Sequence, residues 1–282
     1  MTPARERPSP PLLVAVALAL LVAAALAGCT AAGRTATTAP GRPEAATVAR
    51  PRWAPAVGTG WQWQLTVPVD LRVAVPVYDI DGFENGADVV RRLHALGRRA
   101  VCYVSVGSAE NFRPDYRRFP ASVLGRSNGW PGERWLDIRR VDVLRPIMAA
   151  RFDMCRAKGF DAVEPDNVDG YANTTGFRIS AAQQLAYNRL MAALAHQRGM
   201  SVALKNDLPQ IPALEKDFDF AINEQCVEFG ECRPLMAFIR HGKAVLHVEY
   251  RLSPAKFCPV TRPLRFSSVR KRLELDAWRQ SC

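Results

Sequence analysis

Apolar and polar residues follow two different periods along this chain, and the two periods predict alternating strands and helices. Short apolar runs, some alternating strictly with polar residues, are typical of β-strands. They occur at residues 61–65, 72–80, 100–106, 135–138, 201–205, 218–223 and 244–250, and in a run that begins at Phe160. Helical spacing of apolar residues occurs at residues 86–96, 141–158, 180–198 and 235–239.

Local signals mark the ends of these helices. Ser180 and Gln183 have the spacing of a capping box, in which each side chain bonds the other residue's backbone N–H. Gly97, Gly159 and Gly199 follow the three longest helical patterns, where glycine commonly ends a helix.

Eight predicted strands alternate with helices or long connections, which indicates a parallel sheet with crossover helices. Their number predicts a single α/β domain of the closed (β/α)8 TIM-barrel type over residues 53–282. An open doubly wound sheet is the alternative. The glycine-rich phosphate loops that often accompany such a sheet do not occur in the sequence.

The first 52 residues differ from this pattern. Arg5 and Arg7 precede an apolar run over residues 12–27, which is typical of a secretory signal and short for a membrane span. The run ends Leu-Ala-Gly-Cys at Cys29, which resembles the lipobox of bacterial lipoproteins. We therefore expect residues 1–29 to be a lipoprotein signal with Cys29 lipidated; an ordinary cleaved signal is the alternative. Residues 30–52, rich in Ala, Thr and Pro, predict a disordered tether.

The formal net charge is +11, of which the residues after Cys29 keep +10. Arg supplies 32 of the 38 basic residues, and these are scattered along the chain without a nucleic-acid-binding module. We therefore expect a solvated basic surface and no nucleic-acid partner. We expect a monomer outside the cytoplasmic membrane, either secreted or attached through the N-terminal lipid alone.

Six cysteines remain once Cys29 is set apart, and an even number in an exported chain suggests disulfides. Cys226 and Cys232 enclose a short loop and form the first predicted pair. Cys102–Cys155 and Cys258–Cys282 are the other predicted pairs. No cysteine pair has zinc-ligand spacing and no HExxH motif occurs, so we expect no metal and no cofactor.

Polar side chains collect where the predicted strands end. In a barrel these ends open on one face, and many acids with amides and aromatics suggest a carbohydrate cleft. The residues are Asp79, Asp81, Ser105, Glu110, Asp137, Glu164, Asp166, Lys205, Asn206, Asn223, Glu224, Glu249 and Tyr250. Each acid also has a structural interpretation: Asp79 and Asp81 as loop braces, Asp137 paired with Arg139, and Glu164 paired with Lys205.

Several of these segments together resemble the endo-α-1,4-polygalactosaminidases of glycoside hydrolase family 114. The resemblance lies in residues 61–65, 77–81, 102–110, 164–171, 205–206 and 223–226, which follow the family order across nearly the whole domain. It implies a TIM-type barrel that cleaves α-1,4-linked galactosamine polymers with retention. It also implies catalytic acids at Asp166 and Glu224.

The resemblance and the strand ends together give a predicted site. Asp166 is expected to be the nucleophile and Glu224 the general acid/base of a polysaccharide hydrolase. The expected substrate-binding residues comprise amides for sugar hydroxyls, acids for the amines of a cationic polymer, and aromatic platforms. They are Asp79, Asp81, Tyr103, Glu110, Asn167, Asp169, Tyr171, Lys205, Asn206, Gln225 and Glu249.

Two other functions fit the same residues. A barrel can bind an amino-sugar polymer without cleaving it, because fold alone does not determine activity. A metal-dependent hydrolase or deacetylase is the third possibility, although Asp79, Asp81 and Asp166 match no recognised metal-binding loop.

The signal sequence generates a direct prediction. Replacing Cys29 with Ser removes the thiol that would carry the lipid, so metabolic labelling with a radioactive acyl chain is expected to disappear and the protein to leave the membrane fraction. Acyl labelling and membrane association that persist unchanged in Cys29→Ser would contradict the lipobox interpretation.

Overall fold

Parallel pairing of neighbouring strands builds one curled sheet in the computed structural model, which describes residues 52–282. Among these residues, eight strands pair in parallel in the order β1-β2-β3-β7-β8-β9-β10-β11, and β12 then adds antiparallel to β11. The barrel strands are β1 (Trp61–Gln64), β2 (Val77–Asp81), β3 (Arg99–Ser105), β7 (Ala162–Asp166), β8 (Ser201–Lys205), β9 (Phe220–Glu224), β10 (Val245–Glu249) and β11 (Ser267–Arg270). The expected TIM-type barrel is confirmed.

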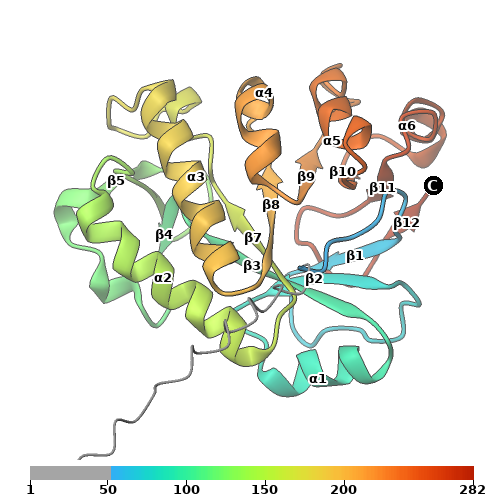
Figure 1. Cartoon of the computed structure of the whole chain (residues 1–282), viewed down its shortest axis with the longest axis horizontal. Coiled ribbons are helices and arrows are strands. Elements are labelled where there is room, and N and C mark those ends of the chain that lie inside the picture. The colour runs from blue at the N-terminus through green and yellow to red at the C-terminus, as the bar shows by residue number, and fades with distance from the viewer. Residues whose placement is uncertain (1–51) are drawn as a thin grey trace, which may run out of the picture. The chain divides into compact units, whose positions relative to one another are not determined.

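Side-chain and loop contacts join the two edges of this sheet. The indole N–H of Trp61 on β1 donates to the carbonyl of Ser267 on β11 at 2.8 Å. The N–H of Leu65 donates to the carbonyl of Leu275, in the segment between β11 and β12 (Gln280–Ser281), at 2.9 Å. Figure 1 shows β12 and the C-terminal end beside β1 and β11.

Successive strand residues alternate between the barrel interior and the outer layer. The interior holds one apolar cluster, which includes the stacked rings of Trp61 and Trp63. The outward residues form a second, larger cluster against the helices, which lie outside the curled sheet in Figure 1. The helices are α1 (Ala87–Ala95), α2 (Val141–Lys158), α3 (Ala181–Gln197), α4 (Ile211–Leu214), α5 (Met236–Arg240) and α6 (Pro254–Thr261).

The predicted helix signals have their expected geometry. Ser180 and Gln183 form both hydrogen bonds of the capping box at the start of α3. Gly159 ends α2 with φ of 92°, a left-handed conformation in which a Cβ would be strained.

The structure differs from the predicted strands at one misplaced strand, one missed strand and one strand boundary. The strand predicted at residues 135–138 is not part of the barrel: β6 (Glu133–Leu136) pairs antiparallel with β4 (Ser108–Glu110) and β5 (Leu124–Ser127) in a small separate sheet. The eighth barrel strand is β11, which the sequence analysis missed because Val269 is its single large apolar residue. The strand predicted at 72–80 begins only at Val77.

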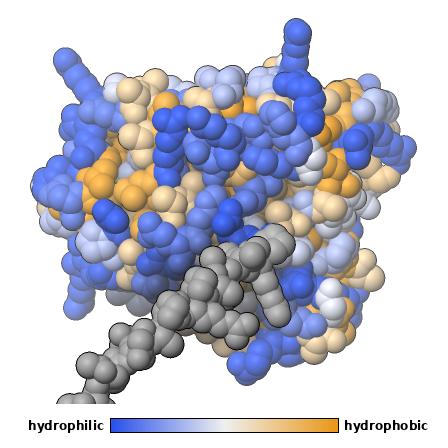
Figure 2. Space-filling model, viewed as in Figure 1, coloured by the Kyte–Doolittle hydropathy of each residue, from blue (hydrophilic) through white to orange (hydrophobic). Residues whose placement is uncertain are grey.

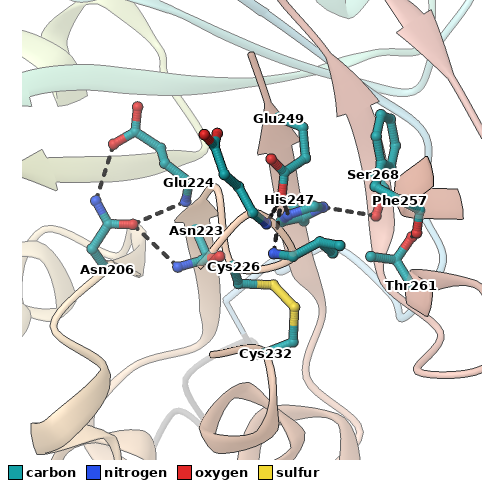
Figure 3. Close-up of a disulfide and its surroundings, with 12 residues drawn as sticks. Asn206, Asn223, Glu224, Cys226, Cys232, His247, Glu249, Phe257, Thr261 and Ser268 are labelled. Carbon is teal, nitrogen blue, oxygen red and sulfur yellow. Dashed lines mark hydrogen bonds and ion pairs between the residues drawn. A yellow bond between two sulfur atoms is a disulfide. The ribbon is translucent and has the colours of Figure 1, made fainter. Parts of the chain in front are cut away.

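Residues 52–282 contain three disulfides, and they are the three predicted pairs. Cys226–Cys232, Cys258–Cys282 and Cys102–Cys155 have Cα separations of 4.8, 5.5 and 6.0 Å, which lie in the ordinary range for disulfides. Cys102–Cys155 joins β3 to α2, and Cys226–Cys232 closes the loop after β9, shown in Figure 3.

Hydrophilic residues cover much of the face seen in Figure 2, with hydrophobic residues in small groups between them. Within residues 52–282, no helix combines the length and apolar character needed to cross a membrane. The predicted signal at residues 1–29, the lipidation site Cys29 and nearly all of the 30–52 tether lie outside the described residues.

The Cys102–Cys155 and Cys226–Cys232 disulfides are expected to differ in their contribution to the free energy of unfolding. Cys102 and Cys155 are 53 residues apart and Cys226 and Cys232 only 6 apart. Loop-closure entropy then gives about 4 kcal/mol for the first bridge and about 2 kcal/mol for the second. Urea unfolding of the Cys102→Ser/Cys155→Ser and Cys226→Ser/Cys232→Ser double variants measures the difference, and a reversed order would contradict it.

Candidate active site

A cleft of about 480 Å³ opens at the carboxyl ends of the barrel strands. Five strands each contribute one inward-pointing residue to the cleft, at positions that alternate in register with the interior apolar cluster. These residues are Trp63 on β1, Tyr103 on β3, Asp166 on β7, Lys205 on β8 and Glu224 on β9. The remaining lining residues are Leu65, Trp130, Glu133, Trp135, Asn167, Val168, Asp169, Asn173, Asn206, Gln225, Tyr250, Leu273, Glu274 and Leu275.

The ammonium of Lys205 lies between three carboxylates. Its Nζ is 3.0 Å from Asp166, 3.1 Å from Glu164 and 3.4 Å from Glu224, and it lies over the Trp63 ring at 4.7 Å from the centroid. One ammonium contacts Asp166 Oδ1 at 3.0 Å and Glu224 Oε2 at 3.4 Å, so these two oxygens are at most about 6.4 Å apart. Two carboxylates this close can flank one glycosidic bond.

Charge and burial oppose each other at Asp166. Burial alone would raise the pKa of this carboxyl, but the nearby Lys205 ammonium and hydrogen bonds from Lys205 and Tyr103 hold the pKa below its ordinary value. Burial would lower the pKa of Lys205, and the charges of Asp166 and Glu224 instead raise it well above its usual range. Lys205 is therefore a fixed cation beside an ionised Asp166.

Each carboxylate of this pair also accepts hydrogen bonds from neutral donors. Tyr103 Oη donates to Asp166 at 2.8 Å, and Tyr250 Oη donates to Glu224 at 2.5 Å. Asn206 Nδ2 donates to the second oxygen of Glu224 at 3.0 Å, as Figure 3 shows. Burial and the adjacent carboxylates raise the pKa of both tyrosines well above the ordinary value, so both remain protonated donors.

The backbone turns sharply directly after each of the three charged residues. Asn167, Asn206 and Gln225 follow Asp166, Lys205 and Glu224, and their φ angles are 63°, 48° and 59°. Non-glycine residues adopt this left-handed region at some cost, and such strain gathers at functional sites. A Cβ on Gly107 would lie 1.7 Å from the Asn167 carbonyl oxygen, so only glycine fits beside this turn.

Two further acids lie beneath the cleft rather than in it. Glu164 is fully buried and pairs with Lys205, as its structural interpretation predicted. Burial raises the pKa of Glu164 to about 7 despite this ammonium. Asp79, expected to contact substrate, is also fully buried; burial and the negative charge of Glu164 raise its pKa well above normal. Asp79 therefore lies in the barrel floor and does not line the cleft.

Asp81 and Glu110, also expected to bind substrate, are not at the cleft. Both are buried around the guanidinium of Arg113, at 2.5 Å from Asp81 and 2.8 Å from Glu110. Asp81 also accepts the backbone N–H groups of Phe83 and Glu84, each at 2.8 Å. These acids brace the segments that follow β2 and β3, because a buried arginine requires carboxylate partners.

Glu249 is the fourth expected substrate residue that the structure does not bring to the cleft. It lies on β10 with outward parity and is fully buried. Its Oε1 accepts the N–H of Val227 at 2.9 Å and lies 3.1 Å from His247 Nε2, and His247 Nδ1 in turn contacts Ser268 at 3.0 Å (Figure 3). Glu249 thus anchors the disulfide loop, residues 226–232.

The structure brings the other predicted residues together and adds several. Of the predicted set, all but Asp79, Asp81, Glu110, Glu249 and Tyr171 line the cleft, and Tyr171 lines an adjoining hollow. Trp63, Trp130, Glu133, Tyr250 and Glu274 were missed as site residues. Strand alternation could have identified Tyr250, because it follows outward Glu249 by one residue. Trp130 and Glu274 lie on connections, and Glu133 begins β6, a strand outside the barrel; the sequence pattern does not specify where these segments run.

Within residues 52–282, no group of three or more His, Cys, Asp or Glu side chains is arranged to hold a metal ion. Around Lys205, the cleft presents the carboxylates of Asp166 and Glu224 and the hydroxyl donors of Tyr103 and Tyr250.

Comparison with known proteins connects this geometry to a family. A protein of Deinococcus radiodurans described as uncharacterized is 29% identical over 212 residues, which are 67% of this chain and 68% of that protein. The crystal structure of Aspergillus fumigatus Ega3 in complex with galactosamine matches with 39% identity and a TM-score of 0.79, covering 82% of this chain and 98% of that chain. The glycoside hydrolase domain of PelA from Pseudomonas aeruginosa shares the fold at 14% identity and a TM-score of 0.61, covering 79% and 97% of the two chains.

The family model of glycoside-hydrolase family GH114 matches residues 42–282, which include the whole barrel and Asp166, Lys205 and Glu224. The chain therefore belongs to family GH114 and is a glycoside hydrolase.

Proposed function

We propose that this hydrolase cleaves α-1,4-linked galactosamine polymers from within the chain and with retention of anomeric configuration. The observation that carries the proposal is the pairing of Asp166 and Glu224 across the Lys205 ammonium, with their contacting oxygens at most about 6.4 Å apart. Retaining enzymes hold their two carboxyl groups about 5–5.5 Å apart, and inverting enzymes need about 6.5–9.5 Å to admit a water molecule.

In the proposed reaction, Asp166 attacks the anomeric carbon while Glu224 protonates the leaving glycosidic oxygen. This step forms a glycosyl–Asp166 ester and releases the rest of the polymer with a new hydroxyl group. Glu224, now ionised, removes a proton from a water molecule that attacks the same carbon, which releases the sugar and regenerates Asp166. The lowered pKa of Asp166 suits a nucleophile, since the group must be ionised to attack.

The local charge of the cleft supports an amino-sugar substrate. Among residues 52–282, five carboxylates line it, those of Glu133, Asp166, Asp169, Glu224 and Glu274, against the single ammonium of Lys205. The protein as a whole is basic, but at physiological salt its distant charges are screened beyond about 8 Å. Amines entering the cleft therefore meet mainly negative charge. The match to Ega3 in complex with galactosamine agrees with this substrate class.

Other cleft residues have proposed roles in holding the sugar. Asn167, Asn206 and Gln225 would hydrogen-bond hydroxyl groups, and Tyr103 would also contact the sugar. We place the reaction outside the cytoplasm, where the three disulfides are stable. A binding protein without activity is not favoured, because the family is one of hydrolases.

Removing either carboxylate is expected to abolish turnover while leaving the fold intact. Asp166→Asn and Glu224→Gln should each reduce the rate by about 10³-fold or more, because one variant loses the nucleophile and the other the proton donor. Mass spectrometry of products from a de-N-acetylated α-1,4-galactosamine polymer measures the rate, and proton NMR of the first-formed anomer distinguishes retention from inversion.

Glu274→Gln is the matched control, because this carboxylate lines the cleft without contacting Lys205 in the structure. It should lower substrate affinity more than turnover. Cleavage by Asp166→Asn at the wild-type rate would overturn the assigned pair, and a first-formed β-anomer would overturn retention.

Lys205 is expected to set the acidic limb of the pH–rate profile. The ammonium holds the pKa of Asp166 down, so Lys205→Met should raise that pKa. The ionised nucleophile would then persist only at higher pH, and the acidic limb of kcat/KM should move upward. Lys205→Arg, which keeps the positive charge, should move it less.

Far-UV circular dichroism and thermal unfolding accompany this test, because breaking a buried ion pair costs about 3–5 kcal/mol. If Lys205→Met is folded and its acidic limb coincides with that of the wild type, Lys205 does not control the ionisation of Asp166.

A further inference from the structure

We propose that a second hollow beside the cleft binds the amino sugar on the leaving-group side of the scissile bond. This inference rests on the proposed function, which it extends by assigning a direction to the bound polymer. The hollow has a volume of about 280 Å³ and lies among the connections that follow β7, β8 and β9.

The second hollow is continuous with the cleft. Asp169, Asn206, Glu224 and Gln225 line both spaces. A polymer bound in the cleft can therefore continue past Glu224 into the second hollow. Its other lining residues are Tyr171, Ala172, Asp207, Leu208, Pro209, Asn223, Phe229 and Glu231.

The position of the two catalytic groups assigns the direction. Asp166 lines the cleft but not the second hollow, whereas Glu224 lines both. The sugar attacked by Asp166 must lie in the cleft, and the oxygen protonated by Glu224 joins that sugar to the next one. A general acid must be within hydrogen-bond reach of the leaving oxygen, so the next sugar lies on the side where only Glu224 remains.

The chemistry of the second hollow suits a sugar that carries an amine. Its lining has carboxylates at Asp169, Asp207 and Glu231, and no Lys or Arg of residues 52–282 lines it. Asp207 is held in place by hydrogen bonds from Tyr171 Oη at 3.1 Å and Asn188 Nδ2 at 2.9 Å. Burial raises the pKa of Asp207 to about 7, and an ammonium bound beside it would favour the ionised form.

A rigid loop holds an aromatic ring at the rim of the hollow. Phe229 belongs to the disulfide loop, and 59% of its surface is exposed. The loop is closed by Cys226–Cys232, by the N–H of Glu231 donating to the Cys226 carbonyl at 2.8 Å, and by the anchor on Glu249. Holding an exposed ring in one place lowers the entropy cost of binding, and the apolar face of a sugar ring is a suitable partner for it.

The experiment uses Phe229→Ala and Glu231→Gln, two substitutions at exposed positions of the loop. Leu96→Ala and Asp88→Asn are the matched controls: both residues are exposed and lie at α1, outside both linings. The substrates are defined α-1,4-galactosamine oligosaccharides that are extended stepwise at the reducing end, which is the leaving-group side.

Two readouts are expected to change together. Each loop variant should lose about five- to tenfold in kcat/KM on oligosaccharides long enough to enter the second hollow, and much less on the shortest one cleaved. In the Asp166→Asn background, calorimetry should show a similar loss of affinity for the longer oligosaccharides. The control variants should match their parents in both measurements.

The binding readout keeps this inference separate from the proposed reaction. If the wild type cleaves none of the oligosaccharides, the proposed function fails, while calorimetry still tests the second hollow. Wild-type affinity and length dependence in both loop variants would overturn the subsite. Equal losses on short and long oligosaccharides would also overturn it, because they would place the effect in the cleft. Circular dichroism confirms that each variant is folded.

Discussion

The charge of a single buried ammonium organises the mouth of this barrel. Lys205 is 3% exposed at its side chain and contacts three carboxylates that come from β7 and β9. Without it, Glu164, Asp166 and Glu224 would repel one another at close range in a poorly solvated space. The Lys205 ammonium contacts acids at two depths of the barrel: Glu164 lies in the barrel floor, and Asp166 and Glu224 face the cleft.

Strand alternation explains how much of the site could be predicted from the sequence. Asp166, Lys205 and Glu224 each end a barrel strand with inward parity, so strand-end reasoning identified all three. The same reasoning failed at Asp81 and Glu110, because their partner is Arg113, on a connection whose path the sequence does not reveal. The strand-end residues included both Glu249 and Tyr250, and the expected substrate-binding set kept Glu249, although adjacent strand residues point in opposite directions.

The fold was predictable for a related reason. Most barrel strands are short apolar runs that lie between predicted helices, and such runs can be identified from the local sequence pattern. The exceptions are strands defined by distant partners. The run that contains Trp135 has the pattern of a barrel strand but pairs with β4 and β5, whereas β11 is polar and is a strand because it pairs with β10. Loop length predicted only the Cys226–Cys232 disulfide. Cys102–Cys155 and Cys258–Cys282 were assigned from the cysteines that remained, and both pairs are present.

The left-handed residues Asn167, Asn206 and Gln225 have a consequence for protein engineering. Mutant libraries aimed at new sugar specificity would naturally randomise them, since all three line the cleft. Valine, isoleucine and threonine at these positions would meet a steric penalty of about 1–2 kcal/mol and could swing the preceding charged side chain away from its neighbours. Restricting these positions to Gly, Asn, Asp and Gln would preserve the backbone while the rim of the cleft is varied freely.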